Sequence, residues 1–379
     1  MRFLHTADWH LGRIFHGLRL TEEQSYLLDQ LIELTKAEKT EAVIIAGDIY
    51  DRGVPPEDAV RLFDEVLCRL VKEAGQKVIL IAGNHDNPAR LGFGQILLAG
   101  ENVFITSPLS ATTSPIVLQD QYGPVYFAPF SYGDPLAART IFRNEAIRSH
   151  EDVLCTQINC MLPQIPPKSR SIAIAHVFLA GAQASPDSER PLAIGGTTSV
   201  SPALFSPFSY TALGHLHMHQ TWGESMAYAG SLMKYSFNET AQKKGVFIIE
   251  LGANKVEALQ SVPLTARHDL KQLRGSFAEL MAGENSELKE AFLQITLTDA
   301  TPILDAKARL EQRYPHILHL QYERLLHQPE SIAQRSQRKL SYLELTTAFF
   351  EQVGEGPLSA EQRDLLAQAI TEVEKGGCQ

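Results

Sequence analysis

Thr211-Ala-Leu-Gly-His-Leu-His217 places two histidines two residues apart, directly after a short apolar run. If residues 210–213 form a strand, Gly214 lets the chain turn at its end, because glycine adopts backbone angles that other residues avoid. His215 and His217 then project from a loop held by a rigid element, where functional side chains usually lie. Such a pair alone is also typical of two ordinary loop histidines, so its interpretation depends on the other predicted strands.

Four other apolar runs have the length of buried strands, and each leads into polar side chains. The runs cover residues 2–6, 42–46, 77–82 and 171–175. Loops at the carboxyl ends of strands in an open α/β sheet share one edge and form its binding crevice. We therefore expect seven side chains from five strands to converge there: Asp8, His10, Asp48, Asn84, His176, His215 and His217.

These side chains offer carboxylate, amide and imidazole donors and no thiolate. The set suits Mn²⁺, Fe²⁺ or Zn²⁺ better than Ca²⁺; Mn²⁺ is our first choice, and Mg²⁺ is also compatible. Seven donors are too many for one ion and divide over two ions about 3.5–4 Å apart, a spacing that stabilises both oxygens of a phosphoryl displacement. Asp48 is the expected bridge, because a carboxylate can bind two cations and an imidazole cannot. The ions would lower the pKa of a bound water, and the resulting hydroxide would attack phosphorus.

Each motif taken alone has an ordinary structural explanation. A D-x-H pair occurs by chance, Gly47-Asp48 fits a plain turn, and Asn84-His85-Asp86 fits a helix cap. Five such motifs, each after its own predicted strand, are not expected by chance. The combination therefore favours metal-dependent phosphoester hydrolysis.

The motifs resemble those of the calcineurin-like metallophosphoesterases: Asp8-x-His10, Gly47-Asp48-x-x-Asp51, Gly83-Asn84-His85-Asp86, His176 and Gly214-His215-x-His217. The surrounding sequence resembles the SbcD-type nuclease subunits within that family, through His5-Thr-Ala-Asp-Trp-His-Leu-Gly12, Ala82-Gly-Asn-His-Asp86, Ala212-Leu-Gly-His-Leu-His217, Tyr228-Ala-Gly-Ser231 and Ser236-Phe-Asn-Glu239. The resemblance is specific over residues 1–262 and rests on layout over 263–379. It implies an α/β fold: a four-layer β-sandwich flanked by helices, then a small α+β cap domain and a C-terminal helix pair.

The same resemblance implies a role for each motif residue. One ion would take Asp8, His10, Asp48 and His217, and the other would take Asp48, Asn84, His176 and His215. His85 would contact the phosphate and protonate the leaving group, and Asp51 would orient His85. At the position of Asp51 the sequence departs from archaeal and eukaryotic relatives, which more often carry a histidine there.

Four neighbouring residues receive other interpretations. His5 lies on the first strand and is expected to be structural, whereas His219 is expected to be a solvated loop residue. Arg13 and His16 follow Gly12 on a loop, where they either contact a DNA phosphate or are plain surface residues.

The composition is that of a globular protein with a substantial core, since 44% of the 379 residues are hydrophobic and 21% are charged. The N-terminus lacks the apolar segment of a secretory signal, and a cytoplasmic location is expected. The four cysteines are scattered and suggest neither disulfides nor a zinc ribbon.

The net charge of −10 argues against binding nucleic acid by overall positive charge, so a DNA enzyme would need bound cations, basic patches or a basic partner.

We predict three parts in the chain: a nuclease domain at 1–262, an α+β capping domain at 263–326, and a linker with C-terminal helices at 327–379. The C-terminal helices are expected at 341–352 and 359–374. Both carry apolar stripes, which either pack on each other or bind a partner helix.

The resemblance implies two partners besides DNA. One is an SbcC-type ATPase, bound through the C-terminal helices. The other is a second copy of the chain, forming a homodimer through helices expected at 55–74 and 88–98. The implied function is a Mn²⁺-dependent DNA exonuclease and endonuclease that acts at DNA ends and hairpins in repair and recombination.

Two alternatives remain open from the residues. A stand-alone phosphodiesterase for a small ester would have little use for the C-terminal helices. A non-catalytic, metal-stabilised interaction scaffold would be expected to have lost ligands, and none is missing here.

Overall fold

The computed structural model describes residues 1–185, 199–283, 286–323, 346–347 and 358–376. The chain divides into two compact units. The first comprises Met1–Leu273, Leu280–Ile295 and Asp305–Leu320, and the second comprises the remaining residues. The division into three domains that we expect from the sequence stays a prediction.

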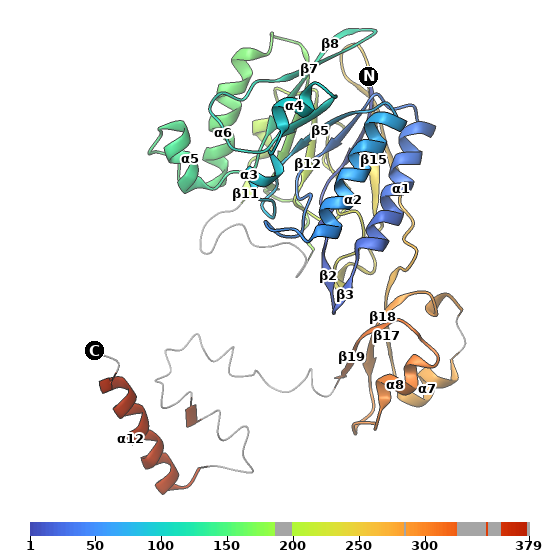
Figure 1. Cartoon of the computed structure of the whole chain (residues 1–379), viewed down its shortest axis with the longest axis vertical. Helices are drawn as coiled ribbons and strands as arrows, with labels where there is room; N and C mark the ends of the chain where they lie inside the picture. Colours follow the sequence, from blue (N-terminus) through green and yellow to red (C-terminus); the bar gives the residue numbers. More distant parts are fainter. Residues whose placement is uncertain (186–198, 284–285, 324–345, 348–357, 377–379) are drawn as a thin grey trace. The chain divides into compact units, whose positions relative to one another are not determined.

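The first sheet has six strands in the order β16-β15-β1-β4-β5-β6. Figure 1 labels β5 and β15 of this sheet. Strands β1, β4, β5 and β6 are parallel, and β15 and β16 continue the sheet in antiparallel fashion. A late strand, β15, thus pairs directly with the first strand of the chain. The strands are β1 (Arg2–Thr6), β4 (Ala42–Ile45), β5 (Lys77–Ile81), β6 (Val103–Thr106), β15 (Gly245–Leu251) and β16 (Val256–Pro263).

The second sheet also has six strands, in the order β13-β14-β12-β9-β8-β7. Its four central strands are parallel, and β7 and β13 are antiparallel edges. The strands are β7 (Ile116–Asp120), β8 (Gly123–Phe130), β9 (Arg170–His176), β12 (Tyr210–Gly214), β13 (Gln220–Thr221) and β14 (Met226–Tyr228).

The two sheets pack face to face because alternate residues of each strand enter different hydrophobic cores. In β1, Phe3 belongs to the core between the sheets and Leu4 to the core under the helices. The core between the sheets is rich in aromatic rings. Phe3 makes edge-to-face contacts with Phe127 and Tyr210, with ring centroids 6.2 and 5.7 Å apart.

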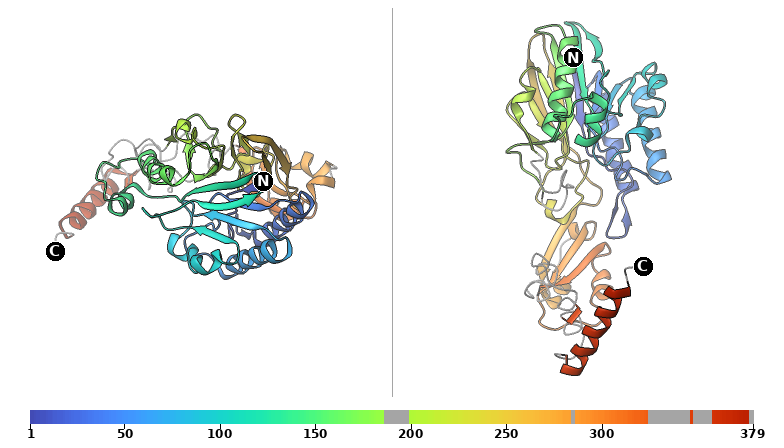
Figure 2. Two further views of the ribbon diagram at one scale, coloured as in Figure 1. Left: turned by 90° about the horizontal axis from the view of Figure 1, so that it is seen from above. Right: turned by 90° about the vertical axis from the view of Figure 1, so that its left-hand side faces the viewer.

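Helices cover the outer faces and complete the predicted four layers (Figure 2). Helices α1 (Thr21–Ala37) and α2 (Glu57–Cys68) pack on the first sheet through residues such as Leu28 and Phe63. Helix α6 (His150–Met161) packs on the second sheet through residues such as Ile158. The α/β sandwich expected from the sequence is thereby confirmed.

Several helix predictions differ from the structure. The helix expected at 55–74 ends as a π-helical turn, Arg69–Glu73. The helix expected at 88–98 is two short helices, α3 (Pro88–Leu91) and α4 (Gln95–Ala99), because Gly94 adopts a left-handed φ of 74° between them. The sequence also predicts that residues 134–164 are mostly helical, and the structure divides this stretch into α5 (Pro135–Phe142) and α6, after left-handed Arg143.

The C-terminal part contains a three-stranded sheet in the order β17-β18-β19. The sequence predicts strands at 291–297 and 317–322, which correspond to β18 and β19. It does not predict β17, because polar residues dominate the sequence LKQLRG of that strand. The helix expected at 341–352 lies outside the described residues apart from 346–347. Residues 183–198 are polar and rich in Gly, Pro and Ser, which predicts a surface loop, and most of them also lie outside the described residues. The elements are β17 (Leu270–Gly275), α7 (Phe277–Ala282), β18 (Phe292–Leu297), α8 (Ala306–Glu311), β19 (Ile317–Tyr322) and α12 (Ala360–Gly376).

Short elements connect these layers. They are β2 (Ile14–Phe15), β3 (Leu18–Arg19), β10 (Phe178–Leu179), β11 (Ser199–Val200) and the 3₁₀ turns Leu162–Gln164, Pro202–Phe205, Phe237–Glu239 and Ser286–Leu288. Within the described part of the chain, no helix is both long enough and apolar enough to cross a membrane.

Replacing Phe127 with alanine should destabilise the protein, because its ring is completely buried between the sheets. We expect the free energy of unfolding to fall by about 3–5 kcal/mol, measured by urea denaturation. Leu136→Ala on α5 is the control, since this side chain is 70% exposed; its effect should stay within about 0.5 kcal/mol. Equal losses in the two variants would contradict the packing described here.

Candidate metal centre

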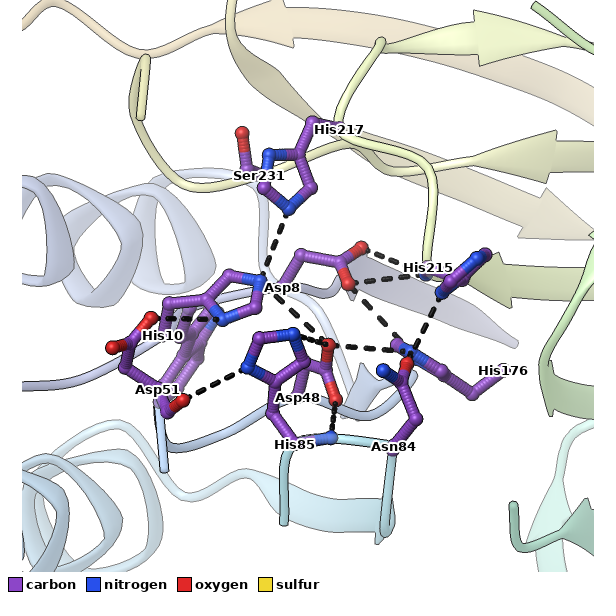
Figure 3. Close-up of polar contacts among 12 residues, drawn as sticks. Asp8, His10, Asp48, Asp51, Asn84, His85, His176, His215, His217 and Ser231 are labelled. Carbon is purple, nitrogen blue, oxygen red and sulfur yellow. Dashed lines mark hydrogen bonds and ion pairs between the residues drawn. The ribbon is translucent and has the colours of Figure 1, made fainter. Parts of the chain in front are cut away.

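The seven predicted donors lie together where strands of both sheets end (Figure 3). Strands β1, β4 and β5 of the first sheet lead to Asp8, His10, Asp48 and Asn84. Strands β9 and β12 of the second sheet lead to His176, His215 and His217. The side chains converge as we expect from the sequence. The prediction that they share the edge of one sheet is wrong, because the five strands are divided between two sheets.

Asp48 lies at the middle of the cluster. Its Oδ2 is 3.4 Å from His176 Nε2, 3.7 Å from His10 Nε2 and 4.0 Å from His85 Nε2. Its Oδ1 accepts a hydrogen bond from the backbone N–H of His85 at 2.9 Å. One oxygen is therefore held by the main chain while the other faces three imidazoles.

The other donors form two groups on either side of Asp48. In the first, His10 Nε2 and His217 Nε2 are 3.1 Å apart, and both rings lie close to Asp8. In the second, Asn84 Oδ1 is 3.0 Å from His176 Nε2 and 3.1 Å from His215 Nδ1. The arrangement offers two adjacent sets of ligands with a carboxylate between them.

The electrostatics of the cluster fit a cation. Burial raises the pKa of Asp8 to about 7 and lowers the pKa of His215 to about 3. Burial also opposes charge on His176 and Asp48, but their attraction prevails: it raises the pKa of His176 to about 9 and holds the pKa of Asp48 well below its usual range. A proton on His176 balances the negative charge of Asp48 in this arrangement. A bound divalent cation would balance that charge instead, so His176 would lose the proton and its ring nitrogen would become available as a ligand.

Hydrogen bonding in the first group also fits a cation. His217 Nδ1 lies 3.0 Å from a carboxylate oxygen of Glu239, which can only accept when ionised, so Nδ1 carries the proton and Nε2 a lone pair. His10 Nδ1 is buried without a hydrogen-bond partner in the described part of the chain. His10 Nε2 and His217 Nε2 face each other at 3.1 Å, and the His217 nitrogen can only accept. Such a pair is suited to binding one positive ion between the two rings.

The backbone around the donors is constrained. Asp8, His10, Asp48 and His215 have φ angles of 51°, 46°, 50° and 97°, which L-residues rarely adopt. Such conformations collect at functional sites, where the surrounding structure holds them. Gly83 is needed beside them, because a Cβ there would lie 2.1 Å from Asp48 Oδ1.

His85 is oriented by the main chain of Asp51. Its Nδ1 donates to the Asp51 carbonyl oxygen at 2.8 Å, which leaves Nε2 facing the cluster. The carboxylate of Asp51 instead accepts from Arg13 Nη1 at 3.0 Å and lies 3.7 Å from His10 Nδ1. The sequence suggests the contact between Asp51 and His85 but does not reveal that a backbone atom makes it.

The neighbouring residues have mostly structural surroundings. His5 is fully buried and bonds to Tyr210, as expected of a structural residue. His219 is not a solvated loop residue: its ring stacks on Phe247 and contacts the carbonyl oxygen of Ala229 at 2.6 Å. Arg13 is paired with Asp51 and lies over the Tyr235 ring, whereas the His16 ring packs near His319.

Comparison with known families agrees with this geometry. Residues 1–178 match the calcineurin-like phosphoesterase family. This match covers 178 of the 379 residues. Residues 266–354 match a second family, SbcD_C, described as the Type 5 capsule protein repressor C-terminal domain. The two matches together make the chain an SbcD-type metallophosphoesterase.

Three solved structures are similar to this chain at low identity. The protein TT1561 of Thermus thermophilus has 15% identity and a TM-score of 0.39, and the match covers 70% of this chain and 99% of that one. A dimetal phosphatase from Danio rerio, LOC 393393, has 14% identity and a TM-score of 0.40, with 70% and 99% covered. Yfce, a phosphoesterase from E. coli, has 13% identity and a TM-score of 0.28, with 69% and 100% covered.

Two buried carboxylates without an assigned role in the sequence support the loops of the metallophosphoesterase centre. Asp86 accepts backbone N–H groups of Gly83, Ile49 and Tyr50 at 2.9–3.2 Å, so it ties the loop after β4 to the loop after β5. Glu239 lies between His217 and Lys244, with its Oε2 2.7 Å from Lys244 Nζ. Both residues lie within motifs quoted above, but those motifs do not reveal what the carboxylates contact.

Replacing Glu239 with glutamine should weaken metal binding, because a neutral amide no longer fixes the tautomer of His217. Burial opposes the ionisation of Glu239, yet its bonds to His217 and Lys244 hold its pKa well below the usual range. We expect a loss of Mn²⁺ affinity of about 10–100-fold, measured by equilibrium dialysis. Glu250→Gln, at an exposed carboxylate on β15, is the control. Unchanged affinity in the Glu239 variant would show that this carboxylate does not support a ligand.

Proposed function

We propose that the chain is a metal-dependent DNA nuclease that hydrolyses phosphodiester bonds at DNA ends and hairpins. The observation that carries the proposal is the presence of a phosphoesterase match and an SbcD C-terminal match in one chain. A phosphodiesterase that acts on a small ester would need only the phosphoesterase domain. The proposal places the protein in DNA repair, recombination and replication, together with an ATPase partner.

The proposed ligands of one ion are Asp8, His10, Asp48 and His217, and those of the other are Asp48, Asn84, His176 and His215. When bound, divalent ions such as Mn²⁺ supply an activated water and neutralise charge on the phosphate. A set of imidazole, carboxylate and amide donors without thiolate supports Mn²⁺ as the ion.

His85 is the proposed general acid. Its Nδ1–H is held by the carbonyl oxygen of Asp51, so the ring cannot turn and Nε2 stays directed at the centre. As an imidazolium, it can donate the Nε2 proton to the oxygen that leaves phosphorus. Asp51 is a positioning residue in this scheme, because it acts through His85 and, with its carboxylate, through Arg13.

Replacing His85 with alanine should reduce cleavage of linear duplex DNA by about 10²–10⁴-fold, the usual contribution of a general acid. Metal content should stay unchanged, because His85 is not a proposed ligand. A Mn²⁺-dependent nuclease assay and metal analysis of the same preparations measure both effects. Cleavage at the parental rate would exclude the proposed acid.

The same assay separates the alternative functions when bis-p-nitrophenyl phosphate is tested beside DNA. Cleavage of both substrates supports the nuclease. Cleavage of the small ester alone supports a stand-alone phosphodiesterase, and no cleavage of either supports a scaffold.

We also propose that the C-terminal helices, of which the structure describes α12, bind an SbcC-type ATPase and that the chain forms a homodimer. The SbcD_C match over residues 266–354 supports the ATPase partner. Helix α12 follows the matched region, and its Leu365, which is 71% exposed, offers an apolar contact. The dimer is supported by an apolar surface around α4, where Phe93, Ile96 and Leu97 are 86%, 86% and 81% exposed. Exposed apolar groups of this kind commonly mark protein interfaces.

A charge on the apolar side of α12 should weaken binding to the ATPase. We expect Leu365→Glu to lower the affinity for an SbcC-type partner about tenfold or more, since one well-buried apolar contact is worth about 1.5–3 kcal/mol. Gln368→Glu, at an exposed position of the same helix, is the matched control. Equal affinities of the two variants in a titration would exclude this face of α12 as the binding surface.

A further inference from the structure

A second group of metal-binding side chains lies away from the centre described above. His268, Glu290 and His316 each offer a ligand atom, and these atoms all lie within 4.8 Å of one another. All three residues belong to the first compact unit. We propose that they form a separate binding site for a divalent transition-metal ion, with Zn²⁺ as the preferred ion.

The three side chains meet because each comes just before a strand of the small sheet. His268 precedes β17, Glu290 precedes β18 and His316 precedes β19. Backbone hydrogen bonds from Phe292 N–H to the Asp269 carbonyl oxygen and from Leu293 N–H to the His316 carbonyl oxygen, each 2.9 Å, hold these strand starts side by side. The group is therefore fixed by sheet pairing rather than by flexible loops.

A buried carboxylate from helix α1 prepares His268 to bind a metal. His268 Nδ1 lies 2.9 Å from Glu23 Oε1, and the same oxygen accepts from the Arg267 guanidinium at 2.9 Å. A carboxylate paired with arginine is ionised and only accepts hydrogen bonds, so Nδ1 carries the proton of the neutral ring. Nε2 then bears a lone pair. Histidines that bind metals usually have a carboxylate at the other ring nitrogen in this way.

The chemistry of the three donors favours zinc. Two imidazoles and one carboxylate are a set that binds Zn²⁺ with a fourth position left for water. His268 and His316 are half-buried, whereas Glu290 is exposed, so an ion can enter from solvent. A purely structural role is the alternative, because the two imidazole rings also pack around Phe292, with centroids 5.0 and 5.8 Å from its ring.

An ion at this site would join the starts of all three strands to one another. Through His268 and Glu23 it would also reinforce the attachment of these strands to helix α1. Neither consequence depends on the catalytic centre, and the site does not depend on the proposed nuclease activity.

The test is equilibrium dialysis of the full chain against Zn²⁺, followed by metal analysis. We expect His316→Gln and Glu290→Gln each to bind about one zinc ion per chain fewer than the parent. Glu290 is exposed, so its variant separates lost binding from misfolding. His319→Gln, at a histidine of β19 outside the group, should bind as much zinc as the parent.

Asp48→Ala distinguishes the two sites. It should lose the ions of the catalytic centre and keep the zinc that Glu290→Gln removes. If His316→Gln and Glu290→Gln both bind as much zinc as the parent, the proposed site is wrong whatever the nuclease assay shows. If Asp48→Ala and Glu290→Gln lose the same ion, the second site does not exist as an independent one.

Discussion

The carboxylate of Asp48, buried among imidazoles where two sheets meet, is the constraint on which the rest of the structure depends. A charge in this position is costly unless it is paired and hydrogen-bonded. One of its oxygens is held by a backbone N–H and the other faces three rings. To bring these groups together, the chain accepts left-handed backbone angles at several donors and a glycine wherever a side chain would collide.

The sandwich provides the rigidity that this cluster requires. Fully buried strands such as β4 and β9 enter the site from different sheets, and interlocked aromatic rings between those sheets fix their spacing. Behind the donors, Asp86 and Glu239 hold the loops in place. The donors face one another at close range, and this arrangement makes sense as a preformed site for cations.

The sequence allowed the donors to be predicted because strand ends with Gly, Asp and His are local patterns. It did not reveal that β9 and β12 lie in a different sheet from β1, because pairing partners are a property of the whole chain. The main-chain contact of Asp51 and the support from Glu239 were not predictable for a similar reason: each depends on the direction of a single atom. Strand β17 was missed because its few apolar residues give little periodicity.

The close approach of Gly83 to Asp48 has a consequence for protein engineering. A side chain at position 83 would occupy the space of the Asp48 oxygen that the backbone N–H of His85, in the same loop as Gly83, holds in place. Single replacements of Gly83 are therefore expected to be rejected in a mutant library unless the loop that carries Asp48 changes with them. Redesign of this region toward another substrate would need coordinated changes in the two loops, or would have to be confined to the outer helices and the C-terminal part.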